Sequence, residues 1–356
     1  MSPTGSPAAS QAGTGEVVRT AADGVGRITL NRPAAINALT AEMIAAVDEA
    51  LEAWADDDAV RTVLLDGAGE RGFCAGADVR ALREAVLDGA TERAVGFLRA
   101  EYRLDERIAT YPKPVVALMD GITMGGGVGL SAHAAVRVVT ERSVVAMPET
   151  RIGFVPDVGS THLLGRAPGR TGFHVGLRAA SVGPGDAIYL GLADHLVPAA
   201  DLPALVEELQ RGRGREVPAA VARFAVPAPE PALAAERWWV DACYGAPTAR
   251  EVVRRLEQHE APGARQAAAD LRALSPTAVA VAHQVLARGA AGILRDALAL
   301  ELRAGVGLAR RPDFVEGIRA QLVDKDRTPR WRPASLAEVD DEDVTRILAT
   351  DVPPLW

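Results

Sequence analysis

The chain has 356 residues, a formal net charge of −8 and 48% hydrophobic residues, which is ordinary usage for a globular protein. The length suggests one large domain with an appendage, or two small domains. An acidic chain lacks the basic face of a nucleic-acid binder, so we expect no nucleic-acid partner. Its two cysteines, Cys74 and Cys243, are too few for a disulfide framework and favour a reducing compartment.

Residues 1–15 are rich in Gly, Ser, Pro and Ala, which predicts a disordered tail. They contain no Lys or Arg and no apolar stretch, so we predict neither a signal peptide nor a transit peptide and expect a cytoplasmic protein. The least polar stretch, 121–136, is shorter than the ~20 residues of a membrane span and is interrupted by glycines. We therefore expect no membrane partner.

From about residue 16 the chain alternates between strand and helix patterns. Apolar and polar residues alternate over 25–30 as in a strand, and Thr40 can cap the helix that follows. The other elements expected are strands at 62–67, at 114–121 and across 136–149, with helices at 91–110 and after the glycines at 125–127. Strand, strand and helix recur about every 40 to 50 residues up to residue 200, which predicts stacked ββα units.

The second half of the chain has a different pattern. Segment 203–212 is helical, 213–235 is rich in Pro, Ala and Arg with little periodicity, and from residue 248 the apolar spacing is helical. Few strands can be placed after residue 200. The sequence predicts an α/β core over 16–200 followed by a helical region over 201–356.

The first candidate site is GITMGGGVGLS at 121–131, where a strand leads into three glycines and a helix start. Glycine allows close approach to the backbone, and a helix N-terminus offers N–H donors to a phosphate or a developing oxyanion. The spacing matches neither a dinucleotide-binding fingerprint nor a P-loop. Taken alone, the motif fits close packing of a helix on a strand equally well.

The second candidate is GFCAGADVRAL at 72–82. Gly76 and Ala77 can expose backbone N–H groups in a tight turn, and two such loops facing each other would form a two-donor oxyanion hole. In isolation an ordinary glycine loop is the simpler interpretation. Cys74 has no evident histidine partner in the sequence, so we interpret it as a small buried residue.

The third candidate is AMPETRIGFVPDVGS at 146–160, which contains Glu149 and Asp157. A lone glutamate is usually a solvated surface charge, but here two carboxylates flank an apolar turn close after the glycine-rich helix start. Apolar surroundings would raise the pKa of one of them and suit it for acid–base or nucleophilic chemistry. The six histidines lack metal-ligand spacing, so we expect no metal.

The chain resembles the crotonase superfamily (enoyl-CoA hydratase/isomerase) in four ordered segments: ITLNRPAAINALT, GFCAGADVRAL, KPVVALMDGITMGGGVGLS and MPETRIGFVPDVGS. The resemblance implies an α/β fold, a crotonase-like spiral of ββα units followed here by the helical C-terminal region. It also implies a coenzyme A thioester as substrate, with no separate cofactor. The N–H groups of Ala77 and Gly126 would form the oxyanion hole.

Hydratases of this superfamily carry two catalytic glutamates. This chain has Gly129 at the first position and Glu149 at the second, so the usual hydratase mechanism is in doubt. Two further segments, SPTAVAVAHQVL (275–286) and DFVEGIRAQLVDKDRTPRWRPASL (313–336), extend the resemblance to the 3-hydroxyisobutyryl-CoA hydrolase family over almost the whole chain. The substrate-binding and catalytic positions that this resemblance implies are Glu101, Gly126, Glu149 and Asp157.

The implied activity is hydrolysis of a short 3-hydroxyacyl-CoA thioester in valine breakdown. Glu149 would attack the thioester carbonyl or activate water, while Asp157 would bind the 3-hydroxyl or position water, and Glu101 could bind the same hydroxyl. Two alternatives remain: a hydratase, dehydratase or isomerase of the same fold, and a non-catalytic member that binds acyl-CoA or a partner protein. The resemblance also allows a homo-oligomer, although the longer C-terminal region would cover the usual contact surface.

Overall fold

The computed structural model describes residues 10–12 and 15–356. The expectation of a disordered tail at 1–15 falls mostly outside the described residues. Within that segment, Ser10–Ala12 form the edge strand β1, which pairs antiparallel with β2 (Val17–Ala22). In the described part of the chain, no helix has the length and apolar character needed to cross a membrane.

The strands form two sheets. A seven-stranded sheet has the order β1-β2-β3-β4-β5-β7-β10, and a three-stranded sheet has the order β6-β8-β9. From β3 to β10 the large sheet is parallel. The remaining strand bounds are β3 (Val25–Leu30), β4 (Thr62–Gly67), β5 (Val115–Met119), β6 (Ile122–Met124), β7 (Val136–Val139), β8 (Val144–Ala146), β9 (Ser181–Val182) and β10 (His195–Leu196).

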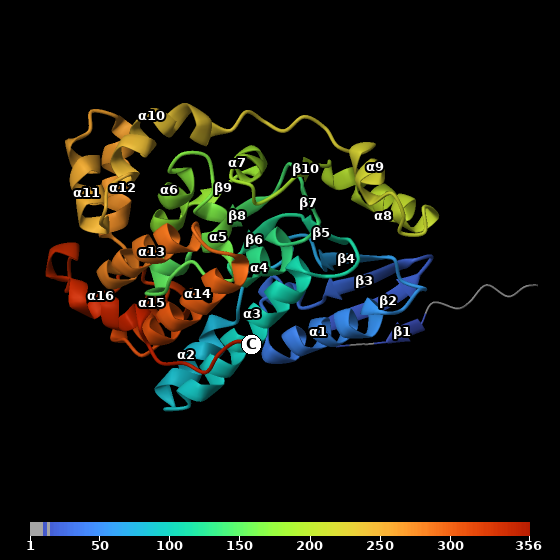
Figure 1. The fold of residues 1–356 in the computed structure, drawn as a ribbon, viewed down its shortest axis with the longest axis horizontal. Coiled ribbons are helices and arrows are strands. Elements are labelled where there is room, and N and C mark those ends of the chain that lie inside the picture. Colours follow the sequence, from blue (N-terminus) through green and yellow to red (C-terminus); the bar gives the residue numbers. More distant parts are fainter. Residues whose placement is uncertain (1–9, 13–14) are drawn as a thin grey trace, which may run out of the picture.

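Helices separate the strands and then fill the second half of the chain (Figure 1). In the first half they are α1 (Ala41–Ala55), α2 (Val79–Leu87), α3 (Thr91–Ala109), α4 (Gly126–Ala132), α5 (Ser160–Leu164), α6 (Thr171–Arg178) and α7 (Pro184–Tyr189). In the second half they are α8 (Leu202–Arg211), α9 (Val217–Ala222), α10 (Ala232–Tyr244), α11 (Ala249–Gln258), α12 (Pro262–Arg272), α13 (Pro276–Gly289), α14 (Leu294–Ala309), α15 (Pro312–Ile318) and α16 (Asp341–Leu348).

Each repeating unit sends its two strands into different sheets. The strand expected at 114–121 is interrupted after Met119, and its continuation β6 pairs with β8 in the small sheet. The bend is at Gly121, whose φ of +68° suits glycine and whose missing side chain leaves room for the Arg71 carbonyl. In the same way β7 joins the large sheet and β8 the small one. The units therefore wind as a spiral between two layers.

Most of the expected elements are present, with two further differences. The segment 72–82 is not all loop, because helix α2 begins at Val79. The weakly patterned segment 213–235 contains α9 and the start of α10, where short alanine-rich helices bury little apolar surface and leave a weak periodic signal. No strand follows β10 among the residues described.

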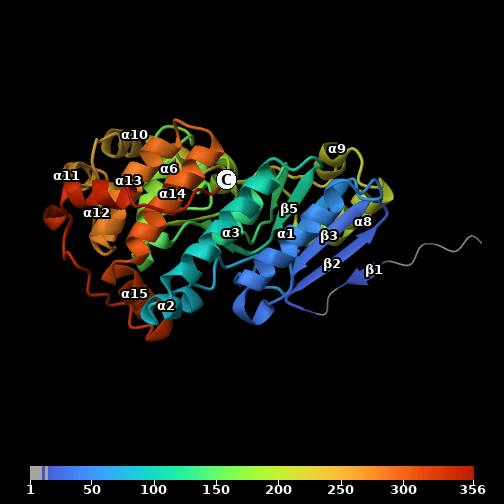
Figure 2. The ribbon, with the colours of Figure 1, turned by 60° about the horizontal axis from the view of Figure 1, so that its bottom comes forward.

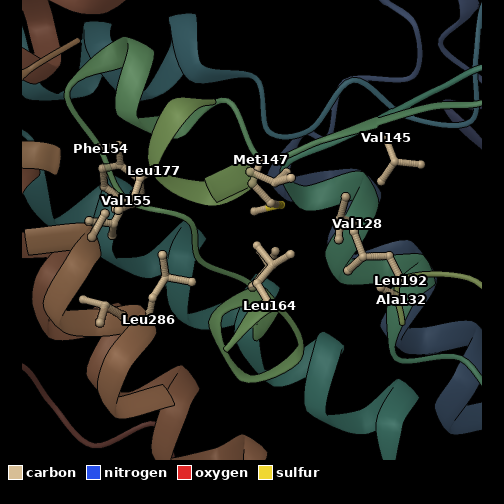
Figure 3. Packing of buried hydrophobic residues seen from close by; sticks show 14 of the residues in the cluster. Val128, Ala132, Val145, Met147, Phe154, Val155, Leu164, Leu177, Leu192 and Leu286 are labelled. Carbon is tan, nitrogen blue, oxygen red and sulfur yellow. The ribbon is translucent and has the colours of Figure 1, made fainter. Parts of the chain in front are cut away.

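The buried core crosses the boundary expected at residue 200. One apolar cluster includes Met147 and Leu164 from the first half and Leu286 and Leu302 from the helical half. Figure 3 shows Leu286 beside Phe154, Leu177 and Val155 within this cluster. A second cluster lies on the other face of the large sheet, where Leu205 of α8 and Val221 of α9 cover β4, β5 and β7.

The helices after residue 200 therefore have two locations. Helices α8 and α9 cover the sheet, while α10 to α16 gather at the opposite side of the molecule (Figures 1 and 2). There α14 contacts α3, and α15 contacts α2 and the short helix Glu149–Ile152. The C-terminal helices are thereby in contact with the elements that carry the predicted site residues.

Candidate active site

All five predicted site residues line one cavity of about 620 Å³. Its wall is formed by the loop 75–79, the start of α4 and residues 148–157, and by Ala309, Phe314 and Leu322 from the C-terminal helices. The rings of Phe154 and Phe314 lie 5.5 Å apart between centroids and make part of the wall apolar. The structure thus brings together residues that the sequence separates by up to 80 positions, from Ala77 to Asp157.

A second cavity of about 630 Å³ lies between α11, α12 and residues 334–337. Two of its arginines, Arg254 and Arg272, are paired with Glu251 and Glu257. No buried side chain with an unpartnered polar atom lines it in the described part of the chain. The chemistry-bearing groups are gathered in the first cavity.

Two backbone N–H groups at the cavity wall are unpaired. Hydrogen bonds from Met124 N to the Cys74 carbonyl (2.9 Å) and from Cys74 N to the Ile122 carbonyl (3.1 Å) join the two glycine loops. Beside this pairing, the N–H groups of Ala77 and Gly126 have no acceptor among the described residues. Gly126 is the first residue of α4, so its N–H also lies at the positive end of a helix dipole.

Two glycines at the start of α4 allow carboxyl groups to lie against the backbone. A β-carbon on Gly126 would overlap with Oε1 of Glu101, and one on Gly125 would lie 2.9 Å from Oε1 of Glu149. Gly125 also has a φ of +50°, which favours glycine. The glycine triplet therefore serves two purposes: it exposes N–H donors and it leaves space for two acidic side chains.

Burial changes the protonation of these acids. Glu149 is 7% exposed, and its Oε2 has no hydrogen-bond partner among the described residues. Burial is the main cause that holds the pKa of Glu149 well above the usual range, and the charge of Asp157 acts in the same direction. Burial also raises the pKa of Asp157 to about 7, although the Tyr102 hydroxyl donates a 2.6 Å hydrogen bond that favours the ionised form. Glu101 is 1% exposed, and burial raises its pKa as well.

Removal of the Tyr102 hydroxyl is expected to raise the pKa of Asp157 above about 7. A hydrogen bond to a charged group contributes roughly 1.5–3 kcal/mol, so Tyr102→Phe should shift this pKa upward by about one to two units. NMR titration of ¹³C-labelled aspartate measures the shift. Tyr244→Phe is the matched control, because the Tyr244 hydroxyl is buried without a partner in the described chain. An unchanged Asp157 titration in Tyr102→Phe would contradict the assignment.

The loop that carries Asp157 is held by a residue of the C-terminal half. Glu301 of α14 is fully buried and accepts hydrogen bonds from Gly159 N (2.7 Å) and from both the N–H and the hydroxyl of Thr161. Burial raises the pKa of Glu301 to about 8. The helical region therefore does more than close the cavity, since it also fixes the backbone that positions Asp157.

Position 129 has no room for a side chain. A β-carbon on Gly129 would lie 2.7 Å from both Oδ1 of Asp105 and Cβ of Val158. Asp105 reaches this place from α3 and is fully buried. A glutamate at position 129 would require both Asp105 and Val158 to move.

Sequence reasoning missed Tyr102, Asp105 and Glu301. A signal for two of them is present, because Asp105 and Glu301 lie among the buried apolar residues of amphipathic helices. A charged residue on an apolar helix face is seldom buried without a specific reason. Cys74 matches the interpretation as a small buried residue, and burial raises the pKa of its thiol to about 12.

The spiral fold and a cavity that unites two free N–H donors with buried carboxyls define an enzyme of the crotonase superfamily. Residues 25–348 match the enoyl-CoA hydratase/isomerase family, and the chain belongs to it. The resemblance and fold class predicted from the sequence are therefore confirmed. Members of this family bind acyl-CoA, so the class of ligand follows.

Two similar proteins are named as hydrolases. The chain is 38% identical to the mitochondrial 3-hydroxyisobutyryl-CoA hydrolase of Gallus gallus over 327 residues, 90% of this chain and 85% of that protein. It is 36% identical to the protein of that name from Homo sapiens over 327 residues, 90% of this chain and 84% of that protein.

Two similar solved structures carry other names. A carnitinyl-CoA dehydratase from Mycobacterium thermoresistibile is 46% identical, with a TM-score of 0.91 and coverage of 96% of this chain and 98% of that one. An enoyl-CoA hydratase from Rhodobacter sphaeroides is 44% identical, with a TM-score of 0.89 and coverage of 94% and 98%. The two sets of relatives thus agree on the acyl-CoA class and differ in the reaction.

Proposed function

We propose that this enzyme hydrolyses a short 3-hydroxyacyl-CoA thioester, with 3-hydroxyisobutyryl-CoA of valine breakdown as the leading substrate. The observation that carries the proposal is that the buried Glu149 carboxyl lies against the glycine turn that exposes the free N–H groups, while Gly129 leaves α4 without a second glutamate. A hydratase mechanism with a second glutamate on α4 has no space in this arrangement. The hydrolase names of the relatives at 36–38% identity support the same reaction.

The N–H groups of Ala77 and Gly126 are proposed as the oxyanion hole. Attack on a thioester carbonyl puts negative charge on its oxygen, and two preorganised donors stabilise that charge in a site from which water is excluded. Each such donor typically contributes about 3 kcal/mol to catalysis. The dipole of α4 acts in the same direction at Gly126.

Glu149 is proposed as the group that starts the reaction. In one route its carboxylate attacks the carbonyl carbon, the C–S bond breaks with loss of the coenzyme A thiolate, and water then opens the mixed anhydride. In the other route Glu149 takes a proton from water as the water attacks. Both routes need the ionised carboxylate, so the rate should rise with pH as Glu149 loses its proton.

Glu101 and Asp157 are proposed to bind the 3-hydroxyl group of the acyl chain. Both line the cavity and both are nearly fully buried. A site built to bond a substrate hydroxyl discriminates strongly against acyl groups without one, because its buried polar groups are then left unpaired. Arg80 and Arg151 also line the cavity and offer positive charge to the coenzyme A phosphates. Arg32 lines it too, but its guanidinium is paired with Glu16 and Asp78.

The rival proposal is a hydratase or dehydratase on the same fold. It is favoured by the names of the two similar structures at 44–46% identity. A third alternative is a family member that binds acyl-CoA without turnover. The presence of both Glu149 and Asp157 argues against this alternative. The cytoplasmic location and the homo-oligomer stay predictions, and the relatives named above are mitochondrial by name.

A thiol-release assay distinguishes these functions. The protein is incubated with 3-hydroxyisobutyryl-CoA and separately with crotonyl-CoA, while coenzyme A release and loss of enoyl absorbance are both followed. We expect rapid thiol release from the hydroxyacyl thioester and no change with crotonyl-CoA. Enoyl loss without thiol release would replace the hydrolase with a hydratase, and the absence of either signal would favour another acyl chain or a binding protein.

A further inference from the structure

The lining of the active-site cavity passes from exposed to buried residues. Ala34 and Arg80 are exposed to solvent, whereas Phe154 and Phe314 are 6% and 3% exposed. The coenzyme A part of a thioester is large and carries charged phosphates, which are costly to bury. It therefore stays at the exposed side of the cavity, and the acyl group extends toward the buried side, where the two rings lie.

Phe154 belongs to the segment that carries the proposed catalytic group. It lies between Glu149 and Asp157 in the chain, and all three side chains line the cavity. The Phe154 N–H donates a 3.0 Å hydrogen bond to the Glu149 carbonyl, which fixes the backbone of Phe154 relative to that residue. An acyl group whose carbonyl lies at Glu149 and whose hydroxyl lies at Asp157 therefore extends beside this ring.

The Phe154 ring rests on a glycine behind it. A β-carbon on Gly305 of α14 would lie 2.5 Å from Cζ of Phe154, and Gly305 itself does not line the cavity. A β-carbon on Gly153 would lie 2.5 Å from the Asp313 carbonyl oxygen, so the turn before Phe154 is in backbone contact with the start of α15. The Phe314 ring of α15 lies 5.5 Å from the Phe154 ring between centroids. The Phe154 ring is therefore held between α14 and α15, and it has no space to retreat toward α14.

We propose that Phe154 is a specificity-determining residue whose ring closes the acyl end of the cavity and limits the substrate to a short acyl chain. The inference rests on the proposed function and adds the feature of the site that selects chain length. Closely packed interiors yield little to added volume, so a longer chain is excluded by a ring that is backed by the α14 backbone. Chain length and the 3-hydroxyl group are then recognised by different residues.

Removal of the ring is expected to admit longer acyl chains. The probes are butyryl-CoA and hexanoyl-CoA, whose Kd values are measured by calorimetry on the full chain. Because each buried methylene contributes about fourfold to affinity, Phe154→Ala should raise the affinity for hexanoyl-CoA relative to butyryl-CoA by about tenfold over the wild-type ratio. Phe154→Leu should change this ratio in the same direction by less, and it replaces the alanine variant if circular dichroism shows that variant to be unfolded.

A substitution behind the ring should have the opposite effect. In Gly305→Ala the added β-carbon pushes the ring toward the cavity, so the affinity for hexanoyl-CoA relative to butyryl-CoA should fall at least about threefold. The matched control is Phe224→Ala, which removes a partly buried ring that packs against the second apolar cluster, outside the cavity. This control should leave the affinity ratio at the wild-type value.

Two results would overturn the role of Phe154. One is an unchanged affinity ratio in the folded Phe154 variants, and the other is a Gly305→Ala ratio that moves toward hexanoyl-CoA. Because the binding measurement needs no turnover, the proposed hydrolase reaction is tested separately. A protein that releases no thiol from any 3-hydroxyacyl-CoA would reject that reaction, while the affinity ratios would still decide the role of Phe154.

Discussion

Replacement of Glu149 by glutamine is expected to lower kcat by at least about a thousandfold, because the amide can neither attack the thioester nor accept a proton from water. Glutamine has nearly the same shape, and the neutral amide is easier to bury than the carboxylate. Folding and binding should therefore be retained. The measurement is the thiol-release rate together with the Kd for the thioester from calorimetry.

The matched control is Glu251→Gln on α11, where a partly exposed glutamate outside the cavity is paired with Arg254 and Arg255. This change should leave both kcat and Kd near the wild-type values. A Glu149→Gln enzyme that turns over within tenfold of wild type would remove Glu149 from the mechanism. A large loss of binding would instead assign Glu149 to substrate recognition.

The second large effect is a fall in the free energy of unfolding as pH rises from 5 to 8. Folding raises the pKa of Asp157 from 3.8 to about 7 and that of Glu301 from 4.5 to about 8, mainly through burial. At a pH between the unfolded and the folded pKa of each group, the native chain holds a proton that the unfolded chain has released. Stability is therefore greatest at mildly acidic pH, and each such proton costs about 1.4 kcal/mol per pH unit as pH rises toward the folded pKa.

Denaturant unfolding at a series of pH values measures this slope. Asp105→Asn and Glu301→Gln each remove one buried titrating group, so both variants should have a shallower slope than wild type. Tyr244→Phe removes a buried hydroxyl without changing a carboxyl and serves as the control. A free energy of unfolding that increases from pH 5 to pH 8 would show that the carboxyl cluster is ionised in the native protein.

The spiral core was predictable because its signals are local. The alternation at 25–30, the Thr40 cap and the strand-to-glycine transition at 121–127 each depend on residues close together in the chain. The Thr40 hydroxyl does accept a hydrogen bond from Met43 N at 3.2 Å. Helix α9 and the start of α10 were not predicted, because within 213–235 they bury few residues and carry little pattern.

The site residues could also be predicted because their sequence signals are local. Glu149 and Asp157 flank an apolar turn, and Ala77 and Gly126 lie in glycine loops, so each stands out within a short segment. No local sequence pattern predicts how the segments that carry these residues come together in space. Their convergence in one cavity results from the spiral, which stacks successive units so that their loops lie at the same edge of the sheets.

The sequence by itself determined the ββα units, the exposed N–H groups of the glycine loops and the acidic residues of the catalytic segment. Only the tertiary structure decided that Glu301 holds the Asp157 loop across 142 positions and that Asp105 occupies the space at Gly129. The physical reason is that a buried carboxyl takes its protonation and its role from whatever surrounds it. Those surroundings come from helices far apart in the chain, and they exist only once the helical half has packed against the core.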